Sequence, residues 1–243
     1  MQLRFVAITA IAIVASSVQV EAAFQTSGAK WGPSQAFGTT GGTVTYSYMP
    51  TGLGIDGSGN SVHLDDFMPT GYKAEIDAAF AAWSNVADIK FVEVADSGTA
   101  FNAAGATGDI RIAGHVFDGV SGVLAHAYLP QVGAPSYAGD IHFDIAENWT
   151  VNGLDGSNST IDIFWVALHE IGHSIGLLHD TNAGSVMSQF YNENISELQA
   201  NDIAGAQFIY GPVPEPGAIA LWGLGALGLV FAGRRRQKTT MTV

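Results

Sequence analysis

The amino-acid sequence predicts an α+β fold in which a mixed, twisted sheet carries three main helices. Short segments of β-forming residues come first, one amphipathic helix interrupts them, and two further helices close the chain. The chain has 243 residues, 47% of them hydrophobic, which is enough for one sizeable core. Because no repeat or long linker divides the middle of the chain, we expect one domain over residues 23–211.

The expected strands are short and separated by loops. Alternating β-formers predict the first strand at residues 43–48. Glycine-rich residues 52–60 and residues 118–122 are expected to be loops. Further short strands are predicted at residues 89–94, 109–113, 122–128 and 141–144.

Three segments have helical character. Residues 74–83 place Ile76, Phe80 and Trp83 on one face, which predicts an amphipathic helix. Residues 161–175 are long and apolar and predict a second helix, and residues 201–209 predict a third.

The N-terminal end has the features of an export signal. Residues 1–22 combine Arg4, an apolar run and small residues before a predicted cut ahead of Ala23, which is typical of a signal peptide. A buried N-terminal helix is the alternative.

The C-terminal end, residues 212–243, resembles the PEP-CTERM sorting signal of Gram-negative bacteria. It has a Pro-Glu-Pro motif at residues 214–216, an uncharged apolar segment at residues 217–233 and arginines directly after it. About 17 residues is the lower limit for a transmembrane segment, so we expect at least transient membrane contact. The resemblance implies an exosortase partner, cleavage near residues 214–216, and export to the cell envelope or extracellular biofilm matrix. A plain anchor helix is the alternative.

Charge and cysteine content exclude several function classes. The chain has no cysteine, which excludes disulfides and cysteine-based metal sites or nucleophiles. Between residues 24 and 211 there are 4 basic and 20 acidic residues, so this region carries a net charge of −16. Such a surface would repel nucleic acid, whereas it suits calcium, which prefers carboxylate oxygens.

One motif carries the chemistry. His169 and His173 are four residues apart, so on a helix both imidazoles face the same side and can bind one metal ion. Gly176 allows a positive-φ turn that brings His179 round as the third ligand. Three histidines leave the fourth position of zinc open, as in catalytic sites. Glu170 is placed to act as the general base on a water molecule, which predicts hydrolysis of protein or peptide substrates without a covalent intermediate.

The eleven-residue motif resembles that of the metzincins, which also have a methionine turn, matched here by Met187. Further stretches narrow the resemblance to the matrixins, the matrix metalloprotease group. The resemblance implies the metzincin fold and a secreted zinc metalloendopeptidase. The matching stretches are residues 30–31, 43–46, 78–83, 108–112, 117–119, 122–127, 139–144, 202–207 and 210–211.

The same resemblance implies further ions. His126 and His142 fall on positions of a structural zinc, but the His-Gly-Asp segment of that site is missing. His115 is the candidate to replace the histidine of that segment. Whether the chain binds a second zinc is left open by the sequence. Calcium positions are matched by Asp118, Asp144 and Glu147 at one site and by Asp109 and Asp140 at another.

The departures from the family concern regulation and substrate. Without cysteine, latency cannot use a propeptide cysteine. Residues 188–191 are expected to form one wall of the specificity pocket. Tyr191 matches the family there, whereas Gln189 stands where the family often has proline. Residues 122–128 are expected to be the edge strand to which a peptide adds.

Two alternatives remain from the sequence. One is a catalytically silent matrix or envelope binding protein on the same fold. The other is a serralysin-like protease, although the glycine-aspartate repeats of that branch are missing from this sequence.

Overall fold

The computed structural model describes residues 24–55, 59–133, 135–151, 153, 159–192 and 194–215. The predicted signal peptide and the apolar segment at residues 217–233 lie outside these residues. Within the described part of the chain, no helix has both the length and the apolar character needed to cross a bilayer.

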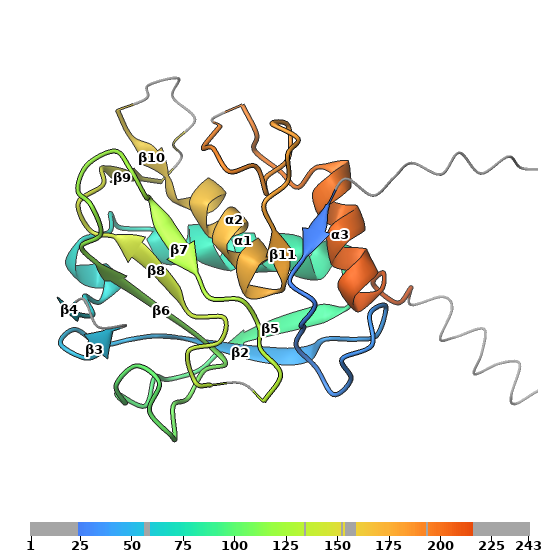
Figure 1. The fold of residues 1–243 in the computed structure, drawn as a ribbon. Coiled ribbons are helices and arrows are strands. Elements are labelled where there is room, and N and C mark those ends of the chain that lie inside the picture. Colours follow the sequence, from blue (N-terminus) through green and yellow to red (C-terminus); the bar gives the residue numbers. More distant parts are fainter. Residues whose placement is uncertain are drawn as a thin grey trace, which may run out of the picture.

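Strands and helices follow the predicted α+β order (Figure 1). The helices are η1 (Leu64–Asp66), α1 (Tyr72–Val86), α2 (Ile163–Ser174) and α3 (Ala200–Tyr210). The strands are β1 (Gln25–Thr26), β2 (Gly42–Tyr48), β3 (Gly54–Ile55), β4 (Gly59–Asn60), β5 (Ile89–Glu93), β6 (Ile110–His115), β7 (Ala125–Ala127), β8 (Ile141–Asp144), β9 (Trp149–Thr150), β10 (Ile161–Asp162) and β11 (Leu177–Leu178).

The main sheet has five strands in the order β5-β2-β6-β8-β7. β2 runs parallel to both β5 and β6, and β6 runs parallel to β8, whereas β7 pairs antiparallel with β8 at the edge. The predicted mixed sheet is therefore confirmed. Its one antiparallel edge strand is the strand that borders the cavity described below.

The core lies between the sheet and the helices α1 and α2. In α1 the side chains predicted from helical spacing are buried, including Ile76, Phe80 and Trp83. The indole Nε1 of Trp83 donates a hydrogen bond of 2.9 Å to the carbonyl of Leu168 on α2. This contact ties the two helices together and gives α2, which carries two of the motif histidines, a rigid support.

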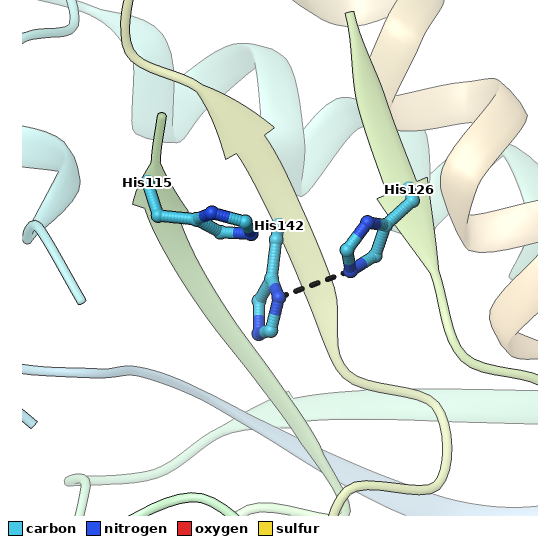
Figure 2. Close-up of side chains that lie close together, drawn as sticks. All are labelled: His115, His126 and His142. Carbon is cyan, nitrogen blue, oxygen red and sulfur yellow. Dashed lines mark hydrogen bonds between the residues drawn. The ribbon is translucent and has the colours of Figure 1, made fainter. Parts of the chain in front are cut away.

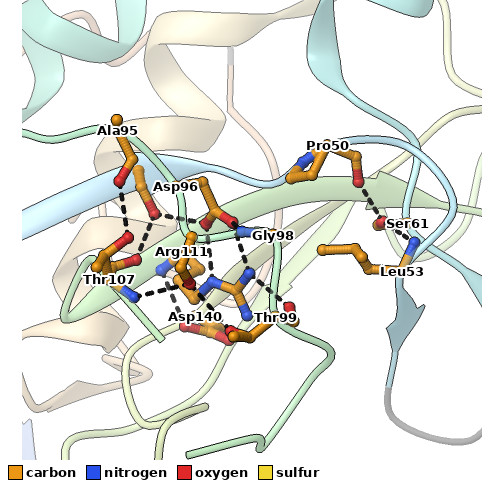
Figure 3. A network of polar contacts seen from close by, with 12 residues as sticks. Pro50, Leu53, Ser61, Ala95, Asp96, Gly98, Thr99, Thr107, Arg111 and Asp140 are labelled. Carbon is orange, nitrogen blue, oxygen red and sulfur yellow. Dashed lines mark hydrogen bonds and ion pairs between the residues drawn. The ribbon is translucent and has the colours of Figure 1, made fainter. Parts of the chain in front are cut away.

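A buried ion pair fastens the loop after β5 to β6 (Figure 3). The guanidinium of Arg111 donates from Nε and Nη2 to the two carboxylate oxygens of Asp96, each at 2.8 Å. Arg111 Nη2 also donates to the carbonyl of Thr99 at 2.8 Å. Since the side chain of Arg111 is fully buried, the paired carboxylate is what makes this burial tolerable.

Element boundaries differ from prediction where a distant segment supplies the partner. The helix predicted from residue 161 begins at Ile163, because residues 161–162 pair with β9, and Asp162 caps the helix by accepting from Trp165 N. The strand predicted at residues 122–128 is only three residues long. The loop predicted at residues 52–60 contains the antiparallel pair β3–β4.

Candidate metal centre

Three histidines of the motif converge on one point. His169 and His173 lie one turn apart on α2, and His179 follows β11. One ligand nitrogen from each can be chosen so that all three lie within 4.8 Å of one another. The ring centroids are 4.7 Å apart for His169–His173 and for His173–His179, and 5.3 Å apart for His169–His179. The structure thus brings together the three side chains that the spacing predicted.

Backbone carbonyls orient two of these rings. His169 Nδ1 lies 2.7 Å from the carbonyl oxygen of Val186, and His173 Nδ1 lies 2.9 Å from that of Leu177. A carbonyl only accepts, so Nδ1 carries the hydrogen and the lone pair stays on Nε2. Burial lowers the pKa of His169 to about 3 and that of His173 to about 4, with a further contribution from the neighbouring histidines. Both rings are therefore neutral at neutral pH, which is the form that binds a metal ion.

A glycine allows the chain to turn toward the third histidine. α2 ends at Ser174, and Gly176 has φ +106°, a conformation that residues with a side chain rarely adopt. A Cβ at Gly176 would also stand 2.7 Å from the carbonyl oxygen of Ala29. The backbone then runs through β11 to His179, so the glycine serves both the turn and the close approach of the N-terminal segment.

Glu170 is the acidic group of this site. Its side chain lines the same cavity as the histidines, and its Oε2 is buried without a hydrogen-bond partner among the described residues. Burial raises the pKa of Glu170 to about 8. A carboxylate held without a competing donor can accept a proton from a water molecule placed in the cavity.

The cavity measures about 920 Å³ and is bounded by α2, by β7 and by residues 189–191. The edge strand thus lines the cleft as predicted, and Gln189 and Tyr191 form part of its wall as expected. Trp165 stacks on His169, with ring centroids 5.5 Å apart and planes 14° apart, and meets the ring of Tyr191 edge-on at 4.9 Å. Trp165 is not among the predicted site residues, although its position four residues before His169 places it on the same helix face.

The methionine turn lies beneath the histidines. Met187 is buried, and its Sδ lies so close to Gly172 that a Cβ there would collide with it. Asp202 on α3 holds the turn by accepting from Val186 N at 3.0 Å, from Met187 N at 3.2 Å and from the hydroxyl of Ser185. Since the carbonyl of Val186 orients His169, the Asp202 carboxylate acts on the metal centre indirectly, through the methionine turn. Asp202 is not among the predicted site residues.

A second histidine cluster lies on the sheet (Figure 2). His115 ends β6, while His126 on β7 and His142 on β8 are directly paired across the strands. Ligand nitrogens from the three rings again lie within 4.8 Å of one another, and His126 Nε2 is 3.1 Å from His142 Nδ1. His115 Nε2 is buried without a hydrogen-bond partner in the described structure. His115 therefore joins the two predicted histidines despite the shortened loop.

The carboxylates of the first predicted calcium site lie near one another. Burial raises the pKa of Glu147, and the charges of Asp144 and Asp118 raise it further. Glu147 Oε1 accepts from Ser121 N at 2.7 Å, and Asp118 accepts from Val123 N at 3.2 Å. Asp118 thus lies on the loop between β6 and β7, and Glu147 contacts the same loop through Ser121.

The two carboxylates of the other predicted calcium site are occupied by different partners. Asp109 Oδ2 accepts from both Thr45 N and Thr45 Oγ1 at 2.8 Å. Asp140 is fully buried and accepts from Arg111 N at 2.8 Å (Figure 3), and burial raises its pKa to about 8. Asp109 therefore also binds the backbone of β2, and Asp140 also binds the backbone of β6.

Comparisons with known proteins match two parts of the chain to known families. The family described as matrixin matches residues 61–211, and the PEP-CTERM protein-sorting motif matches residues 212–236. The chain is 39% identical to the interstitial collagenase of Sus scrofa over 143 residues, covering 58% of this chain and 28% of that protein. It is 35% identical to karilysin of Tannerella forsythia over 144 residues, covering 56% of this chain and 28% of karilysin. The matched region spans less than a third of the length of these relatives.

Proposed function

The chain belongs to the matrixin family and has the metzincin fold, and from this we propose that it is an exported, zinc-dependent metalloendopeptidase. The observation that carries the proposal is the convergence of His169, His173 and His179 beside Glu170 in one cleft. The relatives named collagenase and karilysin support the class of activity.

The donor set fits zinc. Three neutral imidazoles, two of them oriented by carbonyls, are a common protein ligand set for this ion. When bound, zinc supplies a Lewis acid that polarises the scissile carbonyl and acidifies water.

The chain's own residues position the substrate and move the proton. An extended peptide adds as a strand beside β7. One side chain of this peptide then points toward the part of the cavity wall made by Trp165 and Tyr191. Glu170 then takes the proton of the attacking water at its carboxylate and passes it to the leaving amine. The low polarity around Glu170, reflected in its raised pKa, makes it a stronger base than an exposed carboxylate.

The proposal extends to supporting ions. His115, His126 and His142 are proposed to hold a second zinc. This is supported by their convergence and by His115 Nε2, which has no hydrogen-bond partner among the residues that the structure describes. Calcium is proposed at Asp118, Asp144 and Glu147, as sequence and proximity indicate. A second calcium ion is proposed at the pair of carboxylates Asp109 and Asp140, as the family resemblance implies.

Export follows from the tail. The PEP-CTERM match over residues 212–236 indicates export to the cell envelope and implies processing by an exosortase. We include in the proposal a cut near residues 214–216 and release toward the extracellular matrix.

Replacement of Glu170 by alanine tests the activity. We expect Glu170→Ala to remain folded and loaded with zinc while peptide cleavage falls by at least about a hundredfold, because the general base is gone. Chelator-sensitive cleavage of a peptide library measures this, and zinc content is determined on the same samples. Glu197→Ala, which removes an exposed carboxylate, is the matched control. A Glu170→Ala protein as active as the wild type would refute the mechanism.

A further inference from the structure

The second histidine cluster lies on the face of the main sheet that α1 and α2 do not cover. The residues of β6 and β8 that belong to the core beneath these helices are Ile110, Ile112, Ile141 and Phe143. Successive side chains of a strand point to opposite faces, so His115 on β6 and His142 on β8 point away from that core. Arg111 precedes His115 by an even number of residues and therefore shares this face with the cluster.

The loop between β5 and β6, residues 94–109, is tied to the same face. Arg111 donates to both carboxylate oxygens of Asp96 and to the carbonyl of Thr99, each at 2.8 Å (Figure 3). Two residues further along the loop, Phe101 N donates to the carbonyl of the first residue of β3 at 3.0 Å. The backbone at Phe101 is thus held both by the arginine and by a neighbouring strand.

The ring of Phe101 reaches the histidine cluster. It stacks on Tyr137, with ring centroids 5.1 Å apart and planes 20° apart, and lies 5.5 Å from the ring of Tyr128. Its centroid is 6.1 Å from that of His142. Tyr128 lies in turn 5.3 Å from His126. Three aromatic rings from two separate segments therefore form a continuous apolar cover beside two of the histidines.

The other side of the cluster is also apolar. The ring of Phe117 lies 4.0 Å from that of His115 and 4.9 Å from that of His126. An apolar shell of this kind controls how water reaches a bound metal ion. Within the described part of the chain, the cluster consists of three histidines without a carboxylate. How firmly it retains an ion therefore depends on how well the three rings are held and shielded.

We propose that Phe101 is a positioning residue for the second metal centre and that the β5–β6 loop is the cover of this centre. Arg111 fixes the loop, and the loop places the ring of Phe101 against His142. The ring then limits both the rotation of His142 and the entry of water. This inference rests on the proposed binding of zinc by His115, His126 and His142.

The experiment measures zinc release and zinc affinity rather than activity. The full chain is purified with His179→Ala, which removes one ligand of the other centre, so that tightly bound zinc reports on the second centre. Loss of zinc to an excess of a chromophoric chelator gives the release rate, and competition with the chelator gives the affinity. We expect Phe101→Ala to speed release and weaken binding by about tenfold or more, as for other lost supports of metal ligands.

Two further variants separate the ring from general packing. Phe37 is half-buried like Phe101, but it packs on Phe208, with centroids 5.2 Å apart, and not on the rings around the cluster. Phe37→Ala should therefore stay within about twofold of the parent in both measurements. Phe101→Tyr, which keeps the aromatic ring, should restore the release rate and the affinity of the parent.

Each outcome bears on one level of the argument. Parent-like release and affinity in Phe101→Ala overturn the positioning role. An equal change in Phe37→Ala also overturns it, because the effect would then reflect general loosening of the domain. If Phe101→Ala does not fold, Phe101→Val, which also removes the ring, carries the test. A His179→Ala parent that binds no zinc overturns the proposed second centre, and this inference with it, but leaves the proposed protease site standing.

Discussion

At the scale of single residues, His115 shows how position can replace a missing sequence segment. The sequence lacks the His-Gly-Asp segment expected for a second zinc, and only His115 remains near that place. Because His115 ends β6, two strands away from His126, the sheet brings its ring to within 5.8 Å of that ring. The register of the strands, rather than the loop, makes the cluster.

We predict that His115→Ala lowers the zinc content from two ions per chain to one, because two imidazoles alone hold zinc weakly. Elemental analysis of purified protein measures the stoichiometry, and we expect the midpoint of thermal unfolding to fall as well.

His63→Ala is the control for this change. His63 caps a short helix by accepting from Asp65 N at 3.1 Å and lies outside both clusters. The control should keep two zinc ions. A wild-type chain with one zinc, or a His115→Ala chain with two, contradicts the second site.

Residues that act through others are the ones the sequence analysis missed. Trp165 was an apolar residue in a helical run, and Asp202 was one acidic residue among many. Their roles depend on the residues that contact them. His169 stacks on Trp165, and the methionine turn donates hydrogen bonds to Asp202. Asp202 contacts residues 15 to 17 positions earlier in the chain, a separation that helical spacing does not connect. Trp165 lies one helical turn before His169, but it carries no metal-ligating group that would mark it in an apolar run.

At the scale of elements, the ion pair between Asp96 and Arg111 holds a long loop to the central sheet. Burial alone would raise the pKa of Asp96, but hydrogen bonds from Arg111, Gly98 N and Ser47 Oγ hold it below its ordinary value. A carboxyl with a lowered folded-state pKa stabilises the fold above its unfolded pKa. That contribution is lost as the pH falls through the folded value.

We predict that Asp96→Asn lowers the free energy of unfolding at neutral pH by about 3–5 kcal/mol, because it leaves a buried guanidinium unpaired. Below the ordinary pKa of aspartate the difference from wild type should shrink, since the wild-type carboxylate is then being protonated. Urea unfolding at a series of pH values measures both effects. Glu197→Gln on the exposed loop before α3 should change little. A loss that is equally large in acid would argue against the ion pair.

The helices α1, α2 and α3 and the five strands of the main sheet were predictable because their signal is local. Apolar side chains at helical spacing gave α1, and the buried face of α1 agrees with that reading. The start of α2 was two residues off, since β10 forms only where β9 is available as a partner. β1 and β11 were not predicted at all, as each has two residues and depends wholly on the other.

At the scale of the whole molecule, charge is the dominant feature. The domain carries a net charge of −16, and three of its carboxylates gather at the loop between β6 and β7, beside the cleft. Their mutual repulsion destabilises this region unless a cation reduces it. Calcium is suited to such oxygen donors.

We predict that calcium raises the midpoint of thermal unfolding, with a gain of about 2.7 kcal/mol at a concentration a hundredfold above its dissociation constant. Asp118→Asn should reduce this gain, because Asp118 is an exposed donor of the proposed site. Glu93→Gln, a carboxylate on β5, is the control and should keep it. Calorimetry with calcium and with a chelator measures the effect, and an identical midpoint in both would speak against calcium.

The sequence by itself determined the helix with His169, Glu170 and His173 on one face, because a helix repeats every 3.6 residues and needs no distant partner. It also determined the turn at Gly176, the α+β class and the C-terminal sorting motif. Only the tertiary structure decided that His115 completes a second cluster, that Asp202 holds the methionine turn, and that β1 pairs with β11 just before the third histidine. Those contacts join residues far apart in the chain, so they depend on strand order, register and packing, which local spacing does not encode.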